Sequence, residues 1–76
     1  MRIVRVARPA RRFEYRVYPD GHAQEELGLL IQLIRGLSQR GWPFEVAGPA
    51  GILLNIGPLT AAQSASFSQQ WFSHVE

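Results

Sequence analysis

The chain contains no cysteine and no lysine among its 76 residues. Without cysteine it cannot form disulfide bonds or thiolate metal sites, a composition that fits a reducing compartment. No apolar run reaches the roughly 18 residues of a membrane-spanning helix, and residues 1–12 lack the apolar core of a signal peptide. We therefore expect a cytoplasmic protein that makes no membrane contact.

The sequence also lacks the motifs that are typical of catalytic, phosphate-binding or metal-binding sites. Its only histidines are His22 and His74. His22 with Asp20 and Glu25 offers three possible ligands on one turn, but no second cluster accompanies them, which favours an ordinary turn histidine. Residues 48–51 contain two glycines but lack the lysine of a phosphate loop. No motif places a nucleophile beside a base. We expect no catalytic, cofactor-binding or metal-binding residues, and therefore no enzyme.

What the chain does have is arginine, unevenly distributed. The net charge is only +2, yet residues 1–19 hold six arginines against one glutamate, and residues 20–76 hold two arginines against five acidic residues. Clustered basic charge produces a local positive field that suits a polyanionic partner. The planar guanidinium fork suits phosphate and carboxylate groups, although a GC-rich genome would also replace lysine with arginine throughout.

A single helix dominates the apolar pattern. The segment Leu27–Arg40 carries seven apolar residues at helical spacing, over an arc wide enough to contact two packing partners. Gly41 suits the left-handed position after the last helical residue, and Asp20 is the predicted N-cap. A chain of this size forms one domain, residues 1–76, near the lower limit for independent folding. The seven apolar residues are Leu27, Leu29, Leu30, Ile31, Leu33, Ile34 and Leu37.

Two strands are predicted before this helix, Arg2–Ala7 and Arg12–Tyr18. Proline disfavours a two-residue turn, so residues 8–11 are expected to form a four-residue loop around a type I turn. That register pairs Val4 with Tyr15 and gathers the apolar residues on one face. Arg5 then lies across from Glu14. The other face is expected to carry Ile3, Arg5, Arg12, Glu14, Arg16 and Tyr18.

A second hairpin and a second helix follow. The hairpin comprises residues 43–48 and 52–56, and a three-residue loop, 49–51, places Phe44 and Val46 on the face of Ile52, Leu54 and Ile56. Gly57-Pro58 is expected to end the strand. Thr60 and Gln63 match a capping box, which predicts a helix over residues 61–74. Its apolar face is expected to comprise Ala61, Ala65, Phe67, Trp71, Phe72 and Val75.

These elements predict an α+β domain of order ββαββα, with one antiparallel four-stranded sheet and two helices on one face. The alternative is βαββα, in which residues 11–18 are not a paired strand. A two-layer arrangement leaves one face of the sheet open. The sequence contains no internal repeat and no low-complexity segment.

The open face and the first hairpin form the candidate partner-binding surface. Arginines beside an aromatic ring can contact phosphates and stack on bases. We expect a small non-enzymatic protein that binds nucleic acid, or a complex that handles nucleic acid, through this hairpin. One alternative is an inhibitor or adaptor, of the kind that mobile elements or phages encode, that binds an acidic protein surface. Another alternative is a homodimer. The arginines are also consistent with a solvated sheet face that binds no partner, on which they suppress aggregation. The candidate residues are Arg5, Arg8, Arg11, Arg12, Arg16, Tyr18 and Trp42.

Overall fold

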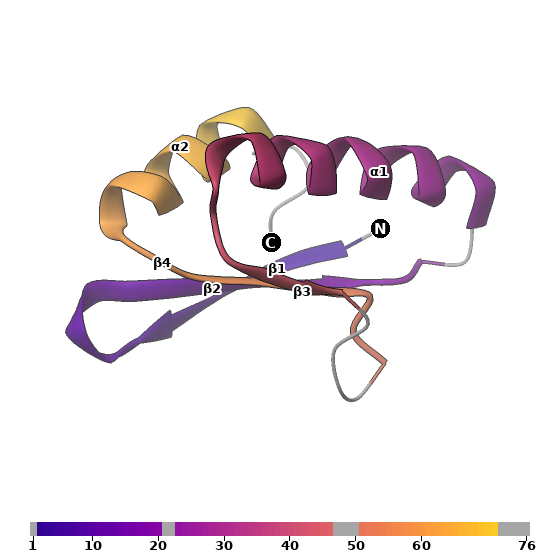
Figure 1. Ribbon diagram of the computed structural model, residues 1–76. Helices are drawn as coiled ribbons and strands as arrows, with labels where there is room; N and C mark the ends of the chain where they lie inside the picture. The colour runs from indigo at the N-terminus through magenta and orange to yellow at the C-terminus, as the bar shows by residue number, and fades with distance from the viewer. Residues whose placement is uncertain (1, 21–22, 47–50, 72–76) are drawn as a thin grey trace.

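The computed structural model describes residues 2–20, 23–46 and 51–71. It confirms the α+β prediction: a four-stranded antiparallel sheet carries two helices on one face, in the order ββαββα (Figure 1). The elements are strands β1 (Arg2–Arg8), β2 (Arg12–Tyr18), β3 (Phe44–Val46) and β4 (Leu54–Leu59), a 3-10 turn η1 (Pro9–Arg11), and helices α1 (Ala23–Arg40) and α2 (Ala61–Trp71).

The strand order is β1-β2-β4-β3, so β2 and β4 are central and β1 and β3 are the edges of the sheet. The core lies between the sheet and the two helices. On β1, β2 and the first part of β4 the core members come from alternate positions, because successive side chains in a strand point to opposite faces. Leu59 is three positions after Ile56, beyond the register shift between β2 and β4. The fully buried core residues are Ile3, Tyr15, Val17, Leu33, Leu37, Leu54, Ile56, Leu59 and Phe67.

Helix α1 ends as its sequence predicts. Gly41 has φ 69°, and its N–H donates to the carbonyl oxygen of Ser38. The N–H of Trp42 donates to the carbonyl oxygen of Leu37, and the two hydrogen bonds together form a Schellman motif. The start differs, because α1 begins at Ala23 and Asp20 is not adjacent to it. Instead the backbone N–H of Asp20 donates to Oε1 of Glu26, 2.6 Å away.

The wide apolar arc of α1 is only partly covered. Leu33 and Leu37 are buried, and Leu30 and Ile34 are partly buried against the core. Leu27 remains 56% exposed and Ile31 48% exposed, on the flank of the helix away from Gly36. The described residues therefore cover the centre of the predicted arc and leave this flank exposed.

Gly28 and Gly36 are helical glycines at which a methyl group would meet no atom within 4 Å. Neither has a positive φ, so alanine fits the backbone at both positions. We expect Gly28→Ala and Gly36→Ala each to raise the free energy of unfolding by about 1 kcal/mol, because alanine loses less conformational entropy in a helix. Urea denaturation checks this, and a loss of stability at either site would contradict it.

The first hairpin has a different register from the one predicted. Arg8 pairs with Arg12, Arg5 with Tyr15, and Ile3 with Val17, one residue away from the expected pairing. The loop has three residues rather than four. The one-residue slip reverses the faces of β1, so Ile3 is fully buried, and Val4 and Val6 lie on the side away from the helices.

The cause of this slip is in the backbone of the loop. Ala10 has φ 62° and Arg11 has φ 56°, so two consecutive non-glycine residues adopt the left-handed conformation. That conformation is uncommon for residues with a side chain, and the sequence carries no glycine to indicate it. The resulting three-residue loop buries an isoleucine against Val17 in place of the smaller Val4.

The second hairpin keeps its predicted register. Val46 pairs with Leu54 and Phe44 with Ile56, so these four side chains share the helix-facing side of the sheet. Residues 47–50, which comprise the predicted end of the first strand and the first two residues of the predicted loop, lie outside the described residues. The predicted strand end at Gly57 is wrong, because β4 continues to Leu59 through a cis Gly57-Pro58 bond.

Helix α2 begins with the predicted capping box. The N–H of Gln63 donates to Oγ1 of Thr60 at 3.2 Å, and the N–H of Thr60 donates to Oε1 of Gln63 at 2.9 Å. The predicted apolar face is only partly right. Ala61 and Ala65 are exposed, while Ser64 and Phe67 are buried. Residues 72–74 of the predicted helix lie outside the described residues.

Two serines of α2 bind the hydroxyl group of a buried tyrosine. The hydroxyl of Tyr15 hydrogen-bonds to Oγ of Ser64 and, at 2.9 Å, to Oγ of Ser68. The Tyr15 ring also packs on Phe67, with centroids 4.3 Å apart. This contact joins the central strand β2 to α2 and fixes which face of β2 points away from the helices.

Candidate functional site

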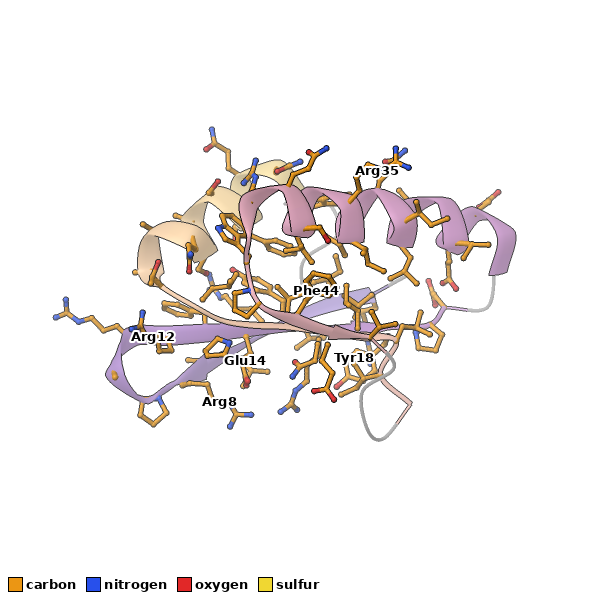
Figure 2. All side chains as sticks on the ribbon, viewed as in Figure 1. Arg8, Arg12, Glu14, Tyr18, Arg35 and Phe44 are labelled. Carbon is orange, nitrogen blue, oxygen red and sulfur yellow. The ribbon has the colours of Figure 1, made fainter. Side chains whose placement is uncertain are left out.

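The open sheet face consists of the side chains on the side of the sheet opposite to α1 and α2. Because Tyr15 points toward α2, its neighbours Glu14 and Arg16 point the other way, and the pairing of β1 with β2 extends this face to Arg2 and Arg8. Figure 2 shows Arg8, Glu14 and Tyr18 on this side. The face carries Arg2, Val4, Val6, Arg8, Arg12, Glu14, Arg16, Tyr18, Glu45 and Asn55.

Two arginines on this face are held by neighbours on β2. The guanidinium carbon of Arg2 lies 4.9 Å from the centroid of the Tyr18 ring. Nε of Arg8 forms an ion pair with the carboxylate of Glu14, which is 17% exposed. The Arg8 guanidinium is therefore paired through Nε while the rest of its side chain stays exposed, and one face of the Tyr18 ring is covered.

Three other candidate arginines carry uncompensated charge. The side chains of Arg11, Arg12 and Arg16 form no hydrogen bond or ion pair with any other part of the chain that the structure describes. Arg11 and Arg12 are exposed at the tip of the β1–β2 hairpin, and Arg16 is half-buried at the centre of the open face. Figure 2 shows Arg12 near the tip, beyond the end of the helices. The uncompensated positive charge thus runs from the tip onto the face.

The central arginine lies in a polar row that crosses the sheet. Arg16 on β2 pairs with Asn55 on β4, which pairs with Glu45 on the edge strand β3. Oδ1 of Asn55 is buried and accepts no hydrogen bond from the described residues. The row changes from basic at β2 to acidic at β3, so the basic half of the open face is the half built from the first hairpin.

Two of the predicted site residues lie elsewhere. Arg5 is on the helix-facing side, opposite Tyr15, with its guanidinium carbon 5.9 Å from the centroid of the Phe13 ring. Its predicted position across from Glu14 on the open face is wrong. Trp42 is packed against the core at the end of α1, with Arg40 over its ring at 4.9 Å. The structure therefore does not bring Trp42 together with the hairpin arginines.

Arg2 belongs to the open face, although the predicted register did not place it there. Its pairing with Tyr18 follows directly from the three-residue loop, so the correct register would have revealed it. The hairpin's one acidic residue, Glu14, was placed on the correct face, but its ion pair with Arg8 depends on the same register. One error in loop length thus accounts for the misplacement of Arg5 and for both omissions.

The described residues contain no group of three histidine, cysteine, aspartate or glutamate side chains that could hold a metal ion. His22 lies outside them. None of the helices in the described ranges is long and apolar enough to cross a membrane. Comparisons with protein-family models, with curated proteins and with solved structures found no match for this chain.

Proposed function

We propose that this protein is a non-enzymatic, cytoplasmic binding protein that contacts nucleic acid through the tip of the β1–β2 hairpin and the basic half of the open sheet face. The observation that carries the proposal is the set of three arginines without a partner in the described chain, Arg11, Arg12 and Arg16. Phosphate contacts supply most of the affinity of such proteins, and arginine binds phosphate in a bidentate manner.

The shape of this surface suits a nucleic acid. A two-stranded β-ribbon fits the major groove of a duplex, and an open antiparallel sheet with an aromatic residue accepts single strands. Tyr18 supplies the aromatic residue on the central strand β2, beside Arg16. Both binding modes use the same arginines, so a comparison of single- and double-stranded probes distinguishes them.

The proposal predicts a steep salt dependence. Labelled single- and double-stranded oligonucleotides, followed by fluorescence anisotropy, are expected to bind with micromolar affinity at low salt. Replacing Arg11, Arg12 and Arg16 together with alanine should weaken binding at least tenfold. It should also reduce the slope of log K against log salt by about 3 for a duplex, because about one counterion is released per phosphate contact.

The control for the loss of a single positive charge away from the hairpin is Arg35→Ala. Arg35 is exposed on α1, on the helix side of the molecule, and its loss removes charge without touching the hairpin (Figure 2). The affinity of the Arg35→Ala variant for the oligonucleotides should stay within a factor of two of that of the unchanged protein. Equal binding by the triple variant would refute the proposal, and failure of every oligonucleotide to bind at low salt would favour an acidic protein surface as the partner.

A further inference from the structure

Strand β1 is a long edge strand that is open to a further strand. It pairs with β2 over seven residues without a register shift, and no described strand lies on its other side. It contains neither proline nor glycine. Alternate residues of an edge strand direct their N–H and C=O groups outward, where an extended chain can bind them.

Three arginines are held in place along this edge. Each contacts a different side chain of β2. Arg2 lies over the Tyr18 ring and Arg5 over the Phe13 ring, while Arg8 forms an ion pair with the Glu14 carboxylate. They recur at every third residue, so Arg2 and Arg8 lie on the open face and Arg5 on the helix-facing side. Cations that are already positioned lose less entropy when they bind a partner.

The same charges oppose the pairing of β1 with a second copy of this chain in which the two strands overlap over their whole length. In an antiparallel pair of β1 strands centred on Arg5, that residue would meet itself and Arg2 would meet Arg8 of the other copy. Like charges directly opposite one another destabilise a sheet. A strand with acidic residues at these three positions would instead meet a cation at each one. Between the arginines of the open face, Val4 and Val6 are half-buried and offer apolar contacts.

We propose that β1 binds an acidic, extended segment of a partner protein, which adds to the sheet as a fifth strand. The backbone edge supplies the hydrogen bonds, and Arg2, Arg5 and Arg8 select carboxylates. This surface is separate from the uncompensated arginines of the hairpin tip, so the inference goes beyond the proposed nucleic-acid contact. The pattern expected of the segment is acidic, any, apolar, acidic, apolar, any, acidic.

A labelled peptide of sequence Glu-Thr-Val-Glu-Val-Thr-Glu tests this surface. Its palindromic order presents the same side chains to β1 in either direction. It should bind the full chain in anisotropy titrations and slow the hydrogen exchange of outward-pointing β1 amides. A peptide with proline in place of the central glutamate should bind at least tenfold more weakly, because proline removes a donor and one of the three carboxylates.

Two double variants with the same change in charge separate edge recognition from simple attraction. Arg2→Ala with Arg5→Ala should weaken peptide binding at least tenfold, while Arg11→Ala with Arg12→Ala should change it less than threefold. Circular dichroism checks that each variant is folded. If the first double variant unfolds, Arg5→Gln alone should still weaken peptide binding.

Three results would overturn the inference: no peptide binding at low salt, equal binding of the proline peptide, or equal losses in the two double variants. None of these depends on the oligonucleotide titrations. Loss of oligonucleotide binding in the hairpin-tip variant with peptide binding intact would show that the two surfaces act independently. Failure of the peptide alone would leave the nucleic-acid proposal standing.

Discussion

Gly57→Ala is expected to destabilise the protein by about 3 kcal/mol or more. Gly57 has φ 120°, a region that is accessible almost only to glycine. A Cβ atom at this position would lie 2.7 Å from the carbonyl oxygen of Phe13 and 3.2 Å from Cα of Glu14. Both contacts are to the backbone of the neighbouring strand, which cannot rotate away as a side chain can. The central pair β2–β4 would have to separate.

Chemical denaturation of Gly57→Ala measures this effect, with Gly28→Ala as the control. The two substitutions add the same methyl group, yet a Cβ on Gly28 meets no atom within 4 Å. We therefore expect opposite signs for the two changes in the free energy of unfolding. A Gly57→Ala variant as stable as the original chain would mean that the bulge between Phe13 and Tyr15 is not held by this close approach.

The sequence predicted those elements whose turn chemistry is explicit. Gly41 ends α1 in a left-handed conformation, and the Thr60–Gln63 box starts α2, because each is a local motif with its own hydrogen bonds. The register of the second hairpin was also correct, since a shift of one residue would place Glu45 on the face of Leu54. Local signals and burial agreed in these places.

The first hairpin shows where such reasoning fails. Both candidate registers place the apolar residues Phe13, Tyr15 and Val17 inside, so burial on β2 does not distinguish them. On β1 one register directs Ile3 toward the helices and the other directs Val4 and Val6 toward them. The first requires a loop in which two residues other than glycine have a positive φ, and the sequence gives no sign of such a loop. The same error changed the predicted site, because Arg5 and Arg2 exchange faces when the register shifts by one residue.

The corrected register also changes how the arginine cluster is understood. The six arginines of the first hairpin are not one uniform patch. Those of β1 are each held by a β2 side chain, while Arg11, Arg12 and Arg16 have no partner among the described residues. A cation that is already positioned favours recognition of a defined carboxylate, whereas one without a partner favours a phosphate backbone. This division is the reason for assigning the two surfaces different ligands.

Tyr15→Ala is expected to cost about 4 kcal/mol, out of a total stability on the order of 5–10 kcal/mol for a domain of this size. Tyr15 is fully buried on the central strand β2, where its ring packs on Phe67 and its hydroxyl reaches two serines of α2. Truncation leaves a cavity and takes this hydrogen-bond partner away from the buried Ser64 and the half-buried Ser68. We expect a thermal midpoint at least 15 °C lower.

Tyr15→Phe measures the contribution of the hydroxyl group to stability apart from that of the ring. It keeps the packing on Phe67 but leaves Ser64 and Ser68 without the hydrogen bonds they make to Tyr15, which should cost about 2 kcal/mol. Adding Ser64→Ala to Tyr15→Phe removes one of these hydroxyl groups and should recover part of the loss. A double-mutant cycle by urea denaturation measures this coupling. Strictly additive losses would show that the tyrosine and the serine stabilise the chain independently, and that the link from β2 to α2 is packing alone.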